Sequence, residues 1–176
     1  MILLVGLGNP TPDSNDNRHN VGFKIIDAIN QKFGLSKQKP KFKGLLTTGN
    51  ISNKKVYAIK PLTFMNNSGV CIRELIECFK INAEDVIVFH DDLDIDFTKI
   101  KTKFGGSSAG HNGIESIDKF IGKDYSRVRV GIGEVGLDSY ERRVRILCAV
   151  LRWKLASERL PFADLLPLMA RIRREP

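Results

Sequence analysis

Residues 85–92 read D-V-I-V-F-H-D-D, a nearly continuous apolar run at 86–89 followed by a histidine and two aspartates. Such a run is typical of a strand at the centre of a sheet, because a central strand is covered on both of its faces. Asp91 and Asp92 follow at the carboxyl end of the run. The segment therefore predicts a central strand with acidic side chains at one edge of a sheet.

Helical and strand-like segments alternate on both sides of this strand. A helix is predicted over residues 19–33, where apolar residues recur at helical spacing up to Gly34. A second helix is predicted to run to about Lys80, with capping candidates at Asn66, Asn67 and Ser68. Further strands are predicted at residues 1–5, 44–52, 55–60, 95–103 and 126–132, with a turn at 53–54 and a short helix at 114–121. The alternation predicts an α/β fold, a single domain whose mixed β-sheet is flanked by helices.

The composition of the 176 residues is that of an ordinary globular protein, with 42% hydrophobic and 27% charged residues. This balance argues against a disordered chain, and the apolar runs are shorter than the ~20 residues of a membrane span. The first ten residues predict a buried strand and not a signal peptide, and the three cysteines lack metal-ligand spacing. We therefore expect a cytoplasmic protein. The formal net charge of +8 favours an anionic partner.

The three histidines each stand beside a small polar residue at a predicted element boundary: His19, His90 and His111. Histidine exchanges protons near neutral pH, so one of the three is a candidate proton carrier. The residues alone leave open which one.

Two ligand-binding patterns match the sequence only in part. Residues 6–11 follow a strand but carry Thr11 where a dinucleotide fingerprint needs its third glycine, and no helix opens on this turn. The acidic cluster of Asp91, Asp92 and Asp94 lacks the glycine and glutamate of a calcium loop. A magnesium site at this cluster stays open as an alternative.

Basic side chains alternate along two predicted strands. Lys99, Lys101 and Lys103 project from one face of the first, and Arg127 and Arg129 repeat the spacing on the second. Residues 105–113 between these strands are rich in glycine and serine, so their backbone amides can approach an anion. The arrangement predicts a surface that contacts phosphate.

Six motifs in this order closely resemble the bacterial peptidyl-tRNA hydrolase family: G-L-G-N-P, R-H-N-V-G-F, K-P-L-T-F-M-N-N-S-G, H-D-D-L-D, K-x-x-G-G-S-S-A-G-H-N-G and R-V-R-V-G-I-G. The resemblance covers about residues 2–133. It implies one α/β domain that hydrolyses the ester between a peptide and the 3′ end of tRNA, with no metal or other cofactor.

The resemblance also implies roles for individual residues of this chain. His19 resembles the family's catalytic base, and Asp91 resembles the carboxylate that orients it. The residues that resemble the family's substrate-binding groups are Asn9, Met65, Asn66 and Asn112. Lys103 and Arg129 resemble a clamp on the 5′ phosphate of tRNA, so the implied partner is peptidyl-tRNA, bound by a monomer.

The resemblance stops after Gly133. Residues 1–133 contain 15 lysines and 4 arginines, whereas residues 134–176 contain 1 lysine and 8 arginines. We hypothesise that residues 134–176 are an atypical helical tail that arose from a shifted reading frame or a recombined gene end. Two alternatives follow: a catalytically weak tRNA- or RNA-binding protein, and a magnesium-dependent phosphoesterase that uses the acidic cluster.

Overall fold

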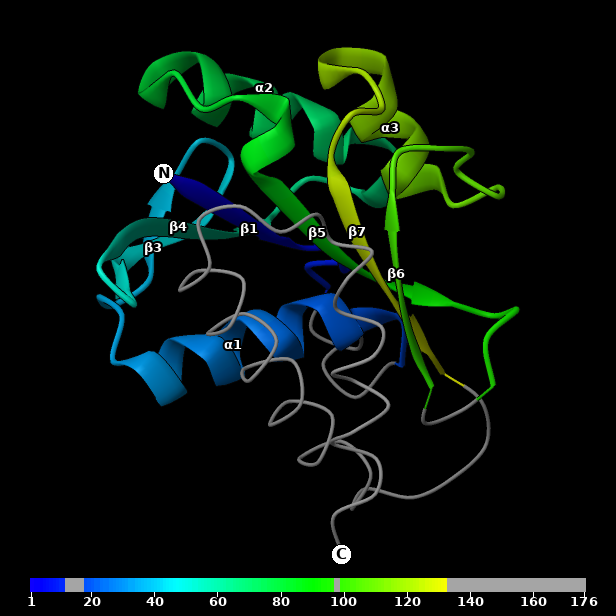
Figure 1. The fold of residues 1–176 in the computed structure, drawn as a ribbon, viewed down its shortest axis with the longest axis horizontal. Coiled ribbons are helices and arrows are strands. Elements are labelled where there is room, and N and C mark those ends of the chain that lie inside the picture. Colours follow the sequence, from blue (N-terminus) through cyan, green and yellow to red (C-terminus); the bar gives the residue numbers. More distant parts are fainter. Residues whose placement is uncertain (12–17, 97–98, 133–176) are drawn as a thin grey trace, which may run out of the picture.

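The computed structural model describes residues 1–11, 18–96 and 99–132, labelled as in Figure 1. The strands are β1 (Ile2–Gly6), β2 (Lys39–Lys41), β3 (Gly44–Ile51), β4 (Lys54–Pro61), β5 (Val86–Asp92), β6 (Ile100–Phe104) and β7 (Ser126–Gly131). The helices are α1 (Val21–Phe33), α2 (Ser68–Phe79) and α3 (Asn112–Ile121), with short 3-10 helices η2 (Arg18–Asn20), η3 (Met65–Asn67) and η4 (Ala83–Asp85).

The described strands form one seven-stranded sheet in the order β2-β3-β4-β1-β5-β7-β6. β1, β4, β5 and β7 run parallel to their neighbours in the middle of the sheet, while β2, β3 and β6 add antiparallel pairs at its two sides. Every residue of β5 is buried. The predicted mixed sheet and its central apolar strand are therefore confirmed.

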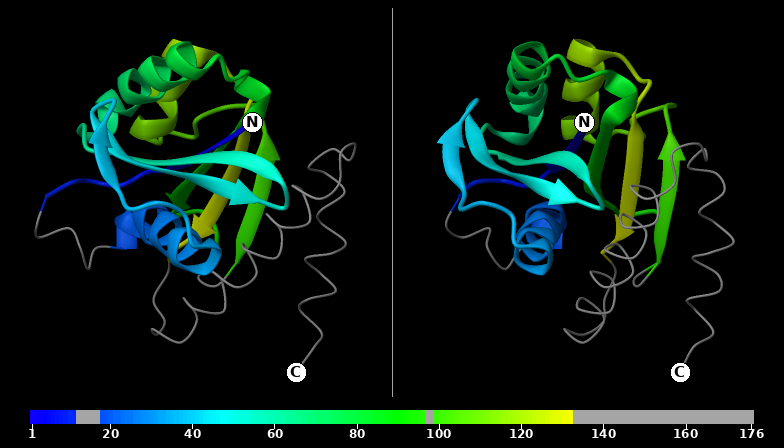
Figure 2. Two further views of the ribbon diagram at one scale, coloured as in Figure 1. Left: turned by 90° about the vertical axis from the view of Figure 1, so that its left-hand side faces the viewer. Right: turned by 60° about the vertical axis from the view of Figure 1, so that its left-hand side comes forward.

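The helices cover the two faces of the sheet, α1 on one side and α2 with α3 on the other (Figure 2). Successive side chains of β5 alternate between these layers, because Ile87 and Phe89 pack with α1 while Val86 and Val88 pack with α2 and α3. Each fully buried large apolar side chain stabilises the fold by about 1.5–3 kcal/mol. Among the described residues, no helix has both the length and the apolar character to cross a membrane.

Several predicted boundaries differ from the structure. The predicted strand at 95–103 begins only at Ile100, because Ile95 is buried in a loop that folds over Gly131. The hairpin turns at Ser52 and Asn53, both with positive φ, and not at residues 53–54. β2 was not predicted, since its three exposed residues carry no apolar alternation.

The start of α2 also differs from the prediction. Asn67 occupies the N-cap position, yet its side chain makes no capping hydrogen bond. The Ser68 hydroxyl instead donates to the carbonyl oxygen of Met65, at 2.9 Å. The preceding 3-10 turn, η3, thus leads directly into the helix.

Close backbone contact fixes where α1 begins. A Cβ atom on Gly22 would lie 2.4 Å from both the nitrogen and the oxygen of Leu7 and 2.6 Å from the carbonyl oxygen of Phe89. These two residues are joined by a hydrogen bond from Leu7 N to Phe89 O, at 3.0 Å, just beyond the end of β1. Only glycine therefore lets the first turn of α1 rest on the backbone of β1 and β5.

Replacing Gly22 by alanine should push α1 away from the sheet, because the added methyl group meets backbone atoms that cannot rotate aside. Overpacking of this kind usually destabilises by about 1–3 kcal/mol. Urea unfolding of Gly22→Ala measures the loss, and Gln31→Ala, an exposed site on the same helix, is the control. Equal unfolding free energies for the two variants would contradict the close-contact argument.

Candidate active site

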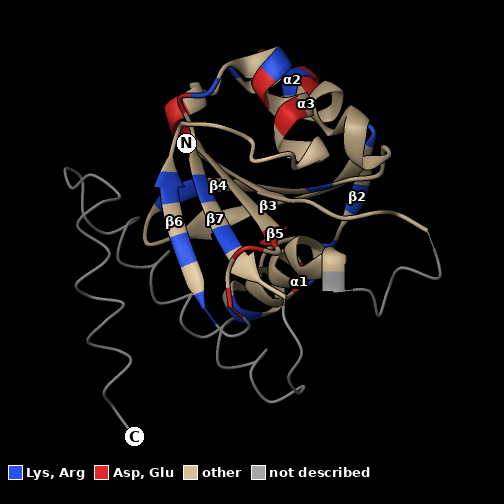
Figure 3. Ribbon diagram, turned by 90° about the vertical axis from the view of Figure 1, so that its right-hand side faces the viewer, with Lys and Arg blue, Asp and Glu red and all other residues tan. Residues whose placement is uncertain are grey.

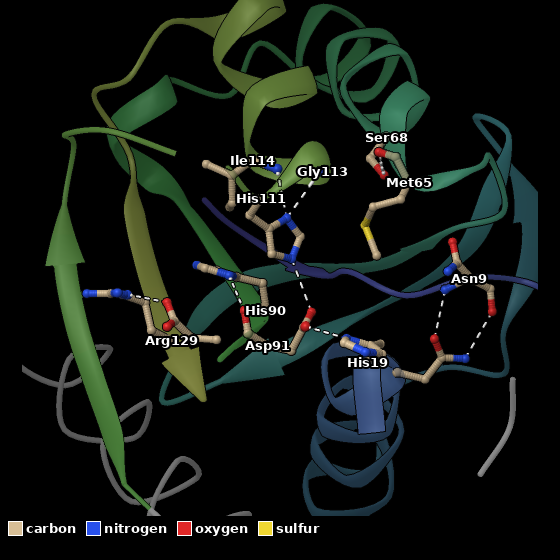
Figure 4. Close-up of polar contacts among 12 residues, drawn as sticks. Asn9, His19, Met65, Ser68, His90, Asp91, His111, Gly113, Ile114 and Arg129 are labelled. Carbon is tan, nitrogen blue, oxygen red and sulfur yellow. Dashed lines mark hydrogen bonds and ion pairs between the residues drawn. The ribbon is translucent and has the colours of Figure 1, made fainter. Parts of the chain in front are cut away.

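A histidine and an aspartate meet at the carboxyl end of β5 (Figure 4). The Nδ1 atom of His19, in the turn before α1, lies 2.6 Å from Oδ2 of Asp91. The Asp91 side chain is 8% exposed, whereas that of His19 is 47% exposed. The pair therefore has a shielded carboxylate and an imidazole that an external ligand can reach.

A second histidine holds the other oxygen of the same carboxylate. Nε2 of His111 lies 3.1 Å from Oδ1 of Asp91. Burial by itself would raise the pKa of Asp91, but the hydrogen bonds from His111 and His19 outweigh burial and hold this pKa below its usual value. Asp91 is therefore ionised at neutral pH.

The third histidine, His90, is buried beneath this cluster. Its Nδ1 atom lies 2.8 Å from the backbone oxygen of Asp91, and its ring meets that of His111 edge to face at a centroid distance of 4.7 Å. In the part of the chain that the structure describes, Nε2 of His90 is buried without a hydrogen-bond partner. Burial, aided by the neighbouring His111, lowers the pKa of His90 to about 4, so His90 is neutral and unsuited to carry protons at neutral pH.

Asn9 lies beside His19 (Figure 4), and hydrogen bonds to its backbone hold it in place. The side chain of Asn20 accepts a hydrogen bond from the Asn9 N–H, at 2.8 Å, and donates one to the Asn9 carbonyl, at 2.9 Å. Asn20 itself is buried. The role of Asn20 was not predicted, and its signal was its position directly after His19 in the motif R-H-N-V-G-F.

The other residues expected to bind substrate lie on η3 and at the start of α3, two elements that pack together. The sulfur of Met65 is 2.6 Å from the place where a Cβ atom on Gly113 would be, so a side chain there would displace it. Asn66 is exposed on η3, and Asn112 is exposed as the first residue of α3. Asn112 directly follows His111, which the sequence marked only as one of three candidate proton carriers.

The two predicted clamp residues, Lys103 and Arg129, lie on the neighbouring strands β6 and β7. Basic residues recur along both strands (Figure 3), and we call their exposed side the basic face. Lys103 is exposed on β6, and its side chain lies against Gly106 of the glycine-rich loop, where a Cβ atom would come within 2.6 Å of the lysine Nζ. Arg129 on β7 donates from Nε to Oδ2 of Asp92, at 2.6 Å. Asp92 was not predicted as its partner.

Arg127 shares the strand face of Arg129 but is buried there, so its expected phosphate contact is wrong. The side chain is only 2% exposed and pairs with Asp118, at 2.8 Å, while NH1 donates to the carbonyl oxygen of Ser107, at 2.9 Å. The guanidinium also lies over the ring of Tyr125. Arg127 is therefore a buried link between β7, α3 and the glycine-rich loop.

The acidic cluster offers little to a cation. Across residues 1–11, 18–96 and 99–132, no group of three or more histidine, cysteine or acidic side chains is arranged to hold a metal ion. Both oxygens of Asp91 face histidines, and those of Asp92 accept from Arg129 and from the backbone N–H of Asp94. Asp91 and Asp92, two of the three carboxylates of the magnesium alternative, therefore already accept hydrogen bonds from donors of the protein.

Comparison with known proteins agrees with this architecture. A family model described as peptidyl-tRNA hydrolase matches residues 3–151. A protein named peptidyl-tRNA hydrolase from Pelagibacter ubique is 85% identical over 133 residues, which are 76% of this chain and 72% of that protein. Its namesake from Ehrlichia canis is 52% identical over 131 residues, 74% of this chain and 68% of that protein.

A solved structure of a peptidyl-tRNA hydrolase also matches this chain. The crystal structure of peptidyl-tRNA hydrolase from Acinetobacter baumannii matches with a TM-score of 0.83 at 29% identity, covering 99% of this chain and 95% of that one. The fold and these matches define an enzyme of α/β architecture built on one mixed sheet. The chain belongs to the peptidyl-tRNA hydrolase family.

The hypothesis about the tail is not tested by the structure, because residues 134–176 lie outside the described ranges. The family model's match continues past Gly133, to residue 151. The division of the chain near residue 133 and the monomeric state both stay predictions.

The neutral, buried His90 should make the protein sensitive to acid. Because its pKa falls from 6.5 to about 4 on folding, the unfolded chain binds a proton between these pH values that the native chain does not. Native stability should therefore fall as pH falls from 6.5 towards 4, and by pH 5 this one group contributes a loss of about 2 kcal/mol.

Urea unfolding at pH 7 and at pH 5 measures this loss. The variant His90→Asn keeps a short polar side chain but cannot bind a proton in this range. Its unfolding free energy should change less between the two pH values than that of the wild type. The same pH dependence in both proteins would show that other groups cause the acid sensitivity.

Proposed function

We propose that the chain hydrolyses the ester bond between peptide and tRNA in peptidyl-tRNA, with a water molecule activated by His19. The observation that carries the proposal is the 2.6 Å contact between His19 Nδ1 and the carboxylate of Asp91. Because this carboxylate is ionised, it accepts a hydrogen bond from Nδ1–H, and the basic lone pair of His19 is then on Nε2.

An ester is hydrolysed in two steps at such a site. Nε2 of His19 takes a proton from water while the water oxygen bonds to the ester carbonyl carbon, which gives a tetrahedral oxyanion. The bond from this carbon to the ribose oxygen then breaks, and the imidazolium returns its proton to that oxygen. The products are tRNA and the free peptide acid, which loses its proton to water, and Asp91 stabilises the transient positive charge on His19.

Three asparagines are proposed to hold the peptide and the developing oxyanion: Asn9, Asn66 and Asn112. Primary amide groups can donate to a carbonyl oxygen and accept from a peptide N–H, so they can bind main chain of any sequence. Met65 supplies an apolar wall beside them, packed against the start of α3. Binding through the main chain suits a substrate whose peptide differs from one molecule to the next.

The basic face is proposed to bind the tRNA. Lys103 pairs in register with Arg127, which lies two positions before Arg129 on β7. Because paired residues share a face of the sheet, as do residues two positions apart, Lys103 and Arg129 project from the same face. Lys103 also touches the glycine-rich loop, whose backbone amides can contact an anion. Together they can bind the 5′ phosphate and so place the acceptor end near His19.

Replacing His19 by alanine should lower turnover by roughly 10²–10⁴-fold, the usual contribution of a general base. The affinity for tRNA should stay within a few-fold, because His19 acts on the reacting water. The assay is release of an N-blocked aminoacyl group from tRNA, with binding measured separately.

Asp91→Asn is the companion variant, since it keeps the size of the side chain and removes its charge. It should lose less activity than His19→Ala, because the base remains but is less well oriented. Activity of His19→Ala within a few-fold of the wild type would remove His19 from the mechanism. Undetectable hydrolysis by the wild type, with tRNA still bound, would favour the tRNA-binding alternative.

Replacing both Lys103 and Arg129 by alanine should weaken tRNA binding and flatten its dependence on salt. Each lost phosphate contact lowers the slope of log K against log [salt] by about 0.7–0.9. Hydrolysis of a minimal ester without the tRNA body should survive, because neither side chain touches the reacting atoms.

The double variant Lys32→Ala, Lys55→Ala is the matched control, because it removes the same charge from exposed positions on α1 and β4. Its salt slope should equal that of the wild type. An equal change of slope in both double variants would mean that only the total charge matters and that β6 and β7 hold no particular phosphate site.

A further inference from the structure

His111 is held in a single tautomer by the start of α3. Its Nδ1 atom accepts hydrogen bonds from the backbone N–H groups of Gly113, at 3.1 Å, and Ile114, at 3.3 Å. A nitrogen that accepts two N–H groups carries a lone pair, so the ring proton of His111 is on Nε2. A further proton on Nδ1 would point at two amide hydrogens.

The proton on Nε2 points towards Asp91, at 3.1 Å from Oδ1. His111 is therefore a fixed donor to this carboxylate, whereas His19 contacts the other oxygen. With one oxygen occupied by a donor that α3 holds in place, the carboxylate cannot turn about its Cβ–Cγ bond without losing a hydrogen bond. His111 is 14% exposed in its side chain, so water competes little for this contact.

We propose that His111 is a positioning residue for the reaction: through its locked Nε2–H it orients Asp91 and limits how strongly Asp91 raises the basicity of His19. This inference rests on the proposed function, because it assigns His111 a role in the same hydrolysis. His111 touches neither water nor ester in this role and acts only through Asp91.

Within the described residues, the charged and titratable groups around this pair come from β5, β7, α3 and the turn before α1. His90 is neutral below the ring of His111. Asp92 and Arg129 form an ion pair with each other, and Glu115 of α3 pairs with Lys119. The acidic limb of the rate profile therefore serves as the readout of the contact between Asp91 and the proposed base, His19.

Two substitutions can remove the hydrogen bonds of Nδ1 and of Nε2 of His111 one at a time. In His111→Asn the amide oxygen can take the place of Nδ1, and asparagine is favoured at this N-cap position, but the side chain is too short to reach Asp91. In His111→Gln the amide nitrogen can take the place of Nε2 and donate to Asp91, while the contact to the helix amides is lost.

The expected results differ in kind. His111→Asn should keep the thermal stability of the wild type but lose roughly 10-fold in kcat, with KM for peptidyl-tRNA within about two-fold. Its acidic limb should move to higher pH, because Asp91 without a second donor raises the basicity of His19 further. His111→Gln should unfold at a lower temperature and keep both kcat within about three-fold and the position of the acidic limb.

A purely structural role would give the opposite pattern, with kcat falling in proportion to thermal stability in both variants and the acidic limb unmoved. That result, or wild-type kcat in His111→Asn, would overturn the proposal. Imidazole nitrogen NMR of the wild-type protein tests the tautomer without any substrate. A protonated Nδ1 on His111 would overturn the inference even if hydrolysis is confirmed. An Nε2–H tautomer in a protein that does not hydrolyse the ester would contradict the proposed function instead.

Discussion

The carboxylate of Asp91 stands where β5 ends and the two helical layers meet. His19 reaches one of its oxygens from the turn before α1, and His111 reaches the other from the N-cap of α3. These helices lie on opposite faces of the sheet, so a single side chain ties both layers to the central strand (Figure 1). The geometry of the candidate site therefore depends on how closely each helix approaches the end of that strand.

The order of elements was predictable because the apolar periodicity of this chain is strong. The apolar run at 86–89 and the helical spacing before Gly34 both describe elements that bury most of their length. The edge strand β2 and the start of β6 were missed or misplaced, because exposed edge strands need no apolar pattern. Ile95 misled the strand prediction, since it is buried by a loop and not by the sheet.

The candidate site was predictable as a set of residues and only in part as an arrangement. The motifs pointed to His19 and Asp91, and the structure brings these two side chains together. The alternation of basic residues placed Arg127 on the correct face of β7 but could not show that α3 covers it there. Likewise, the link from Asp92 to Arg129 joins residues 37 positions apart and depends on strand order, which no local pattern encodes.

The buried side-chain amide of Asn20 binds both the N–H and the carbonyl of Asn9. His19 precedes Asn20 directly in the chain, and α1 follows it. Two hydrogen bonds thus fasten the peptide unit at residue 9 to the turn that carries His19, although ten positions separate residues 9 and 19 in the chain. A tilt of α1 that kept these two bonds would therefore move the Asn9 backbone together with the turn that carries His19, and would alter the distance of both from Asp91.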